Sequence, residues 1–78
     1  MKEVSLVNGL VKWFNDKIGF GFIEYKESID VLVHYSQVKK EGYKSLKQGD
    51  YVSFDLIETG KGLQALNVCV IKQAVATK

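Results

Sequence analysis

Short apolar runs alternate along the chain with polar segments that contain glycine. The runs are rich in valine, isoleucine, leucine and aromatic residues, which suit the pleated, half-buried surface of a β-strand. Residues 36–46 lack this pattern and are predicted to form a helical turn followed by a loop. Short strands without a long helix predict an all-β fold, a small closed barrel that leaves no sheet edge unpaired. The strands are predicted near residues 4–14, 18–25, 30–35, 50–57 and 63–71.

The last two predicted strands alternate between apolar and polar positions, so one face of each is expected to turn toward the core. The apolar positions are Val52, Phe54 and Leu56 in the first of these strands and Leu66, Val68 and Val70 in the second.

Two phenylalanines, Phe20 and Phe22, share one face of the second predicted strand, and Gly19 and Gly21 share the other. Taken alone, two such rings are more often core residues than surface residues. The neighbouring strand changes this interpretation. A hairpin that turns at residues 25–29 would pair Phe20 with His34, Phe22 with Leu32, and Glu24 with Asp30.

The face that carries the phenylalanines would then also hold Glu24, Asp30 and His34, which are costly to bury without partners. The opposite face holds small apolar side chains, those of Ile23, Val31 and Val33. We therefore predict that the valine face turns inward and that the rings form an exposed cluster. Such a cluster on a small domain marks an interaction surface.

A second aromatic pair lies upstream, in Lys12-Trp13-Phe14-Asn15. A lone tryptophan is usually a core residue. If a bulge interrupts the alternation here, Val11 and Phe14 can face the core while Lys12 and Trp13 join the phenylalanines. Aromatic planes for base stacking, framed by cations for phosphates, hold single-stranded nucleic acid without reading its sequence. The lysines expected to frame the rings are Lys12, Lys17, Lys39, Lys40, Lys44, Lys47 and Lys61.

Composition limits the alternatives. With 78 residues we expect one domain, residues 1–78. The net charge of +2 is too small to indicate nucleic acid by itself, and all eleven basic residues are lysine, so the arginine fork that reads guanine is absent. One cysteine and one histidine exclude an internal disulfide and an ordinary zinc site. No apolar run is long enough to span a membrane, and we expect a cytoplasmic protein without metal or cofactor.

The sequence resembles the bacterial cold shock proteins from about residue 9 to residue 71. The resemblance rests on Lys12–Asn15, Gly19–Ile23, Asp30–Ser36, Gly42–Leu46, and the hairpin that contains Gly60-Lys61-Gly62 and Gln64-Ala65. It implies a five-stranded antiparallel OB-fold barrel that binds single-stranded RNA and DNA. It also implies melting of RNA secondary structure, regulation of transcription or translation, and a link to cold adaptation.

The resemblance also implies roles for individual residues. The rings would be stacking platforms, Lys12 and Lys61 would meet phosphates or base edges, and three polar side chains would bind bases. The platforms are Trp13, Phe20, Phe22, His34 and Tyr43, the base-binding residues are Asn15, Asp30 and Gln64, and Phe14 and Tyr35 complete the contacts.

The chain departs from the family pattern at four positions. Leu32 stands where a phenylalanine is usual, and Ile18 takes the place of a lysine, with Lys17 one position upstream. Tyr35 replaces a phenylalanine and Leu63 a proline. Lys17 and Leu32 are included in the predicted site, and we expect a competent binder whose affinity is weaker or differently tuned.

Two other functions were weighed. An enzyme is not expected, because His34 and Cys69 lie far apart in sequence and neither a phosphate-binding loop nor a paired carboxylate site is present. A small barrel of the SH3 type that binds proline-rich peptides is the stronger alternative. The Gly-Phe-Gly-Phe spacing and the lysines favour nucleic acid, with pyrimidine-rich strands preferred and a monomer expected rather than a dimer.

Overall fold

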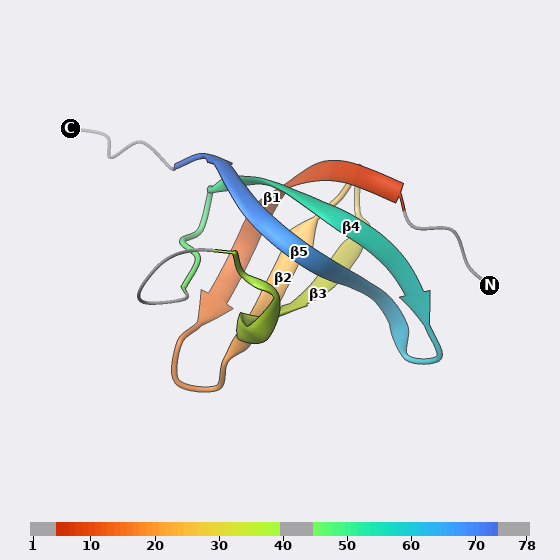
Figure 1. The fold of residues 1–78 in the computed structure, drawn as a ribbon, viewed down its shortest axis with the longest axis horizontal. Helices are drawn as coiled ribbons and strands as arrows, with labels where there is room; N and C mark the ends of the chain where they lie inside the picture. The colour runs from red at the N-terminus through yellow and green to blue at the C-terminus, as the bar shows by residue number, and fades with distance from the viewer. Residues whose placement is uncertain (1–4, 40–44, 74–78) are drawn as a thin grey trace.

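The computed structural model describes residues 5–39 and 45–73 of the chain. Its five strands confirm the prediction in number and nearly in position (Figure 1). The predicted helical turn is a short 3-10 helix that begins one residue earlier than expected. No helix in the described ranges is long and apolar enough to cross a membrane. The elements are β1 (Ser5–Asn15), β2 (Phe20–Glu24), β3 (Asp30–His34), η1 (Tyr35–Gln37), β4 (Tyr51–Thr59) and β5 (Gly62–Lys72).

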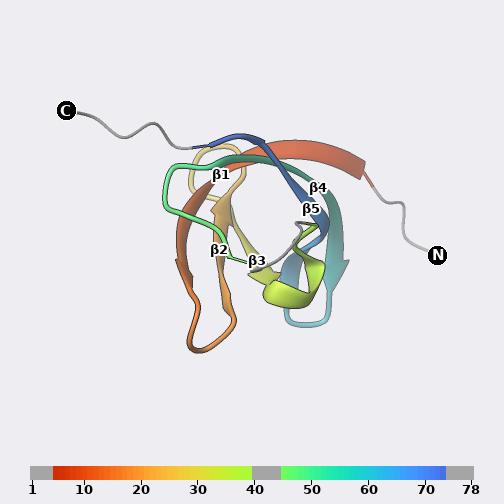
Figure 2. The same cartoon turned by 60° about the vertical axis from the view of Figure 1, so that its left-hand side comes forward.

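The strands close into a barrel in the order β1-β2-β3-β5-β4, with β4 paired back to β1. Figure 2 shows the ring that they form. Neighbouring strands run antiparallel except β3 and β5, which are parallel and meet at a single register pair, Leu32 with Gln64. This is the OB-fold architecture that the resemblance implied, with its ring closed on one side by a short parallel contact.

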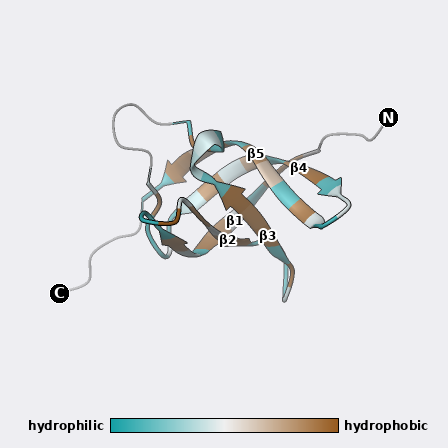
Figure 3. Ribbon diagram, turned by 90° about the horizontal axis from the view of Figure 1, so that it is seen from below, coloured by the Kyte–Doolittle hydropathy of each residue, from teal (hydrophilic) through white to brown (hydrophobic). Residues whose placement is uncertain are grey.

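The predicted hairpin of β2 and β3 is confirmed in register and in facing. Phe20 pairs with His34 and Phe22 with Leu32. The opposite face turns inward, with Ile23, Val31 and Val33 fully buried. Figure 3 shows β2 and β3 coloured hydrophobic along much of their length, because both their inward and their outward positions carry apolar side chains.

Among the described residues, the register of the strands shifts at three places, and two of these irregularities decide which side chains are buried. The first lies between Val11 and Trp13 in β1, where the sequence required one. The second lies in β5 at Asn67, whose backbone is left-handed with φ of 52°. Asparagine tolerates this conformation better than most residues. The shift turns Ala65 and Val68 into the core, so the prediction that Leu66 shares the buried face with Val68 is wrong.

The core also recruits residues from outside the strands. Val38 and Leu46 flank the loop after η1, and both are buried. Tyr25 and Ile29, the two ends of the β2–β3 turn, pack against the core as well. The barrel is therefore closed at its ends by side chains that a strand pattern does not reveal.

Candidate nucleic-acid interface

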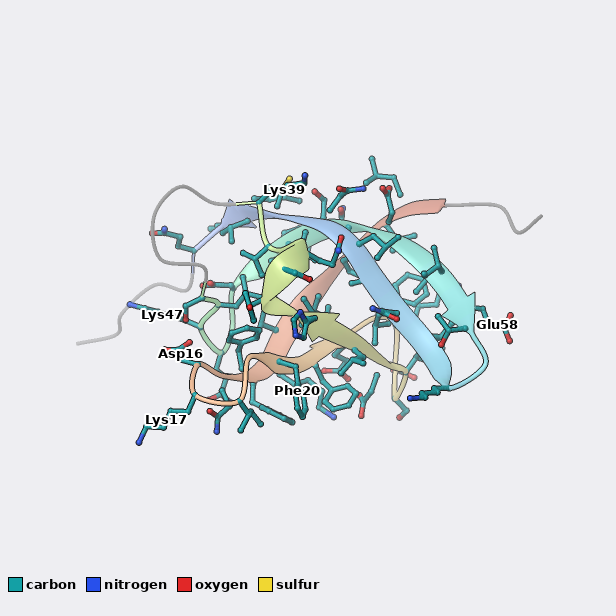
Figure 4. The ribbon with its side chains drawn as sticks, turned by 60° about the horizontal axis from the view of Figure 1, so that its bottom comes forward. Asp16, Lys17, Phe20, Lys39, Lys47 and Glu58 are labelled. Atoms are coloured by element: carbon teal, nitrogen blue, oxygen red, sulfur yellow. The ribbon has the colours of Figure 1, made fainter. Side chains whose placement is uncertain are left out.

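Three aromatic rings from two adjacent strands meet on the outside of the barrel. The ring centroid of Trp13 lies 6.0 Å from that of Phe20 and 5.5 Å from that of Phe22, with tilted or edge-on geometry. The Trp13 side chain is 41% exposed, and both phenylalanines are half-buried. Figure 4 shows Phe20 at the edge of the molecule, directed away from the barrel. The predicted exposure of these rings is confirmed.

The neighbouring rings of His34 and Tyr35 extend this surface. Their centroids are 4.6 Å apart with planes inclined by 32°. His34 Nδ1 accepts the backbone N–H of Ser36 at 3.2 Å and lies 2.9 Å from Ser36 Oγ, so the imidazole caps η1 and is held in place. We call Trp13, Phe20, Phe22, His34 and Tyr35 the aromatic face.

Two glycines, Gly19 and Gly21, allow the strands and rings of the aromatic face to pack this closely. A Cβ on Gly21 would lie 2.6 Å from the Cα of Phe14, so only glycine lets β2 approach β1 this closely. Gly19 has a φ of 82°, and a Cβ there would lie 2.8 Å from the ring of Tyr35. The two glycines thus place β2 against β1 and leave room for Tyr35 beside the β1–β2 loop.

The β1–β2 loop is ordered by Asn15. Its side-chain oxygen accepts the backbone N–H groups of Lys17 at 2.8 Å and Ile18 at 3.1 Å, and its backbone carbonyl accepts that of Gly19. The side-chain amide nitrogen of Asn15 takes no part in these hydrogen bonds.

A polar pair flanks the aromatic face. Lys12 Nζ lies 3.1 Å from Asp30 Oδ1, and the two side chains are 43% and 47% exposed. Lys12 is on β1 and Asp30 on β3, so the pair reaches across β2. The bulge in β1 is what turns Lys12 toward this side.

A cleft of about 230 Å³ lies where β3 meets the β4–β5 hairpin. Leu32 and Gln64, which pair in register, both line it. The cleft is smaller than the roughly 300–1,000 Å³ of a drug-sized ligand site. Its walls are formed by Phe22, Asp30, Leu32, Thr59, Lys61, Gly62, Leu63 and Gln64.

Most of the predicted site residues that the structure describes gather at the aromatic face or this cleft. Phe14 instead packs against the core, and Lys17 extends from the tip of the β1–β2 loop (Figure 4). Lys39 lies on the far edge of that view from Phe20, so the expectation that it frames the rings is wrong. Tyr43, Lys40 and Lys44 lie outside the described residues.

Sequence reasoning did not assign Thr59 or Leu63 to the site. Thr59 Oγ1 accepts the N–H of Lys61 at 3.1 Å and donates to the carbonyl of Gly62, so it shapes the hairpin that carries Lys61. No local signal could place these residues beside Leu32, because the β3–β5 contact joins distant segments. Among the described residues, no group of three His, Cys, Asp or Glu side chains could hold a metal ion.

Comparisons with known proteins agree with this geometry. The family model of the 'Cold-shock' DNA-binding domain matches residues 7–71. The cold shock-like protein CspB of Bacillus cereus is 55% identical over 62 residues, which cover 80% of this chain and 95% of that protein. The cold shock protein CspD of Bacillus subtilis is 52% identical over 61 residues, 78% of this chain and 92% of that protein. The cold shock protein CspA of Staphylococcus saprophyticus is 53% identical over 60 residues, 77% and 91% respectively.

Proposed function

The chain belongs to the family of cold-shock DNA-binding domains, and from this premise we propose that its aromatic face binds single-stranded RNA and DNA. The observation that carries the proposal is the cluster of Trp13, Phe20 and Phe22 on the barrel surface, where the ring centroid of Trp13 lies 6.0 Å from that of Phe20 and 5.5 Å from that of Phe22. An exposed tryptophan beside two half-buried phenylalanines forms an apolar surface patch, and such patches mark interaction sites.

Binding would combine stacking with a few charge contacts. Each base stacked on an aromatic side chain contributes about 1–3 kcal/mol, and this interaction tolerates any base. Lys61 and Gln64 line the cleft, and we expect Lys61 to meet a phosphate or a base edge there. Because all basic residues are lysine, the protein has no bidentate arginine with which to read guanine. Binding is therefore expected to be sequence-tolerant, with pyrimidine-rich strands preferred because they unstack readily.

The same surface accounts for activity as an RNA chaperone. A protein that binds unpaired bases and not paired ones shifts RNA away from its folded helices by mass action. Release of RNA secondary structure would in turn affect transcription or translation, and it matters most in the cold, when helices are most stable. We place this activity in the cytoplasm and assign it to a single, monomeric cold-shock domain.

The peptide-binding alternative uses the same rings differently. An SH3-like groove binds a proline-rich helix between aromatic walls. Here the rings are accompanied by Lys61 and Gln64, which suit phosphates and base edges better than a proline-rich segment that has neither. This arrangement favours nucleic acid.

A titration of oligothymidine, followed by the fluorescence of Trp13, tests the proposal. Trp13 is the only tryptophan, so its signal reports on the aromatic face alone. Saturable quenching is expected with a strand of about six or seven nucleotides, within the range of OB-fold sites. A duplex of equal length and a proline-rich peptide serve as controls and should bind much more weakly. Equal or tighter binding of the duplex would contradict the proposal, and tighter binding of the peptide would favour the alternative.

A further inference from the structure

A hydrogen bond between distant residues fastens the loop that joins β1 to β2. The Ser45 hydroxyl donates to Asp16 Oδ1 at 2.5 Å, across a separation of 29 residues in sequence. This length is typical of a strong O–H···O bond to an ionised carboxylate. A hydroxyl has one proton to donate, and the alternative acceptor, the carbonyl of Leu46, is 3.5 Å away. Ser45 therefore donates to Asp16.

Ser45 is anchored from the core, whereas the loop is exposed. Leu46, next in the chain, is only 3% exposed, and the N–H of Lys47 donates to the buried carboxylate of Asp50 at 3.0 Å. Asp16 and the residues on either side of it are exposed instead. In Figure 4, Asp16 lies on the same side of the molecule as Lys47. The bond thus ties a solvated loop to a segment that the core holds in place.

The same loop adjoins the aromatic face. It ends at Gly19, directly before Phe20, and the carbonyl of Gly19 accepts the N–H of Tyr35 at 2.9 Å. Motion of the loop would therefore reach two rings of the face, one on β2 and one at the start of η1. Ordering such groups during binding costs affinity, and a surface that is ordered beforehand avoids that cost.

We infer that Asp16 and Ser45 are positioning residues, whose hydrogen bond holds the β1–β2 loop and keeps Phe20 and Tyr35 in place before a strand arrives. This inference rests on the proposed function and adds to it a pair that acts through the loop. Its effect is opposite in sign to simple electrostatics. Removing the Asp16 carboxylate takes a negative charge from beside a surface that binds a polyanion, which by itself strengthens binding. Loss of the hydrogen bond weakens it.

Oligothymidine titrations of Asp16→Ala, Ser45→Ala and Ser45→Thr test the inference. Both alanine variants are expected to bind about two- to tenfold more weakly, the range set by ordering one side chain during binding. Ser45→Thr keeps the hydroxyl and should restore most of the affinity. Because no phosphate contact is lost, the log–log salt slope of Ser45→Ala should equal that of the wild type.

Asp55→Ala is the matched control for the loss of a carboxylate. Asp55 Oδ2 accepts the side-chain N–H of Asn67 at 2.9 Å, a bond that joins β4 to β5 outside the aromatic face. Its removal should cost no affinity. A loss as large as that of Asp16→Ala would show that the effect does not depend on the β1–β2 loop and would overturn the inference.

Amide hydrogen exchange of the free protein gives a readout that does not depend on binding. The N–H of Gly19 donates to the carbonyl of Asn15, and that of Tyr35 donates to Gly19. In Asp16→Ala both amides should exchange several times faster, because the loop that they close opens more often. The amide of Tyr25, which donates to the carbonyl of Ile29 at the other end of β2, should keep its rate.

A double-mutant cycle completes the test. If the pair acts as a unit, Asp16→Ala combined with Ser45→Ala loses no more affinity than either single variant. Additive losses, equal or tighter binding by Asp16→Ala, or a changed salt slope in Ser45→Ala would overturn the inference. So would unchanged exchange at Gly19 and Tyr35, whether or not the protein binds oligonucleotides. If the wild-type protein binds none while these rates change as expected, the proposed function is wrong and the hold of the pair on the loop is nevertheless confirmed.

Discussion

At the scale of single residues, the rings of the aromatic face are exposed enough to bind and packed enough to keep their positions. Trp13, Phe20 and Phe22 support one another through tilted contacts and contribute little to the buried core. Replacing any of them by alanine should therefore weaken oligothymidine binding by about 1–3 kcal/mol while largely preserving the fold. Binding curves measured beside thermal melts separate the two effects.

Phe54→Ala is the matched control, because Phe54 is a phenylalanine that is fully buried in the core. It should cost about 3–5 kcal/mol of unfolding free energy. If the substitutions of the aromatic face destabilised the protein as much as Phe54→Ala does, these rings would be structural and the assignment of the face wrong.

Leu32 stands where the family pattern usually has a phenylalanine, and we propose that this position can hold a base. It lies opposite Phe22 and lines the cleft beside Gln64, so a phenylalanine there would extend the aromatic face toward Lys61. Leu32→Phe is expected to tighten oligothymidine binding by about 0.5–2 kcal/mol, part of the 1–3 kcal/mol that one stacked base provides. Leu6→Phe, at an exposed position near the start of β1, should leave affinity unchanged. Unaltered or weaker binding by a folded Leu32→Phe variant would mean that no base stacks at this position.

At the scale of elements, the close approach of β1 and β2 depends on Gly21. A Cβ there would meet the Cα of Phe14 at 2.6 Å, and backbone atoms cannot move aside as a flexible side chain can. Gly21→Ala should therefore destabilise the fold by about 3 kcal/mol or more, beyond the usual cost of overpacking. Gly60→Ala provides the control, since nothing lies within 4 Å of its added Cβ. Equal denaturation midpoints for the two variants would show that β1 and β2 can separate without cost.

The elements that the sequence predicted well are those whose partners are close in the chain. The register of β2 and β3 followed from one hairpin and from the cost of burying Asp30 and His34, and the structure confirms it. The bulge of β5 was missed, because the left-handed backbone at Asn67 is stabilised from distant positions. Its N–H donates to Gln37 Oε1 and its side-chain amide to Asp55 Oδ2. Neither partner can be identified from local alternation.

At the scale of the whole molecule, the aromatic face and the cleft differ in the same way: the first is made by segments that are close in sequence and the second by segments that are far apart. The aromatic face is built from β1, β2, β3 and the start of η1, which follow one another in sequence, and its residues could be predicted. The cleft requires β5 to run parallel to β3, and this pairing joins Leu32 to Gln64. The prediction that Lys39 lies beside the rings was wrong for a related reason: the segment after η1 pairs with β5, where Lys39 N–H donates to the carbonyl of Val68, and this contact again joins distant parts of the chain.

The modest charge of the molecule predicts a weak response to salt. Net charge is only +2, and of the lysines that the structure describes, Lys12 is engaged with Asp30 while Lys61 stands at the cleft. With about two or three phosphate contacts, each contributing about −0.7, the log–log slope of affinity against salt should lie near −1.4 to −2.1. Stacking is expected to provide the remaining affinity, and it depends little on salt.

Lys61→Gln should therefore make the slope shallower by about 0.7. Phe22→Ala should instead weaken binding equally at every salt concentration and leave the slope unchanged. A wild-type slope steeper than about −4 would mean that contacts to the phosphates of the nucleic acid, and not stacking on its bases, provide most of the affinity.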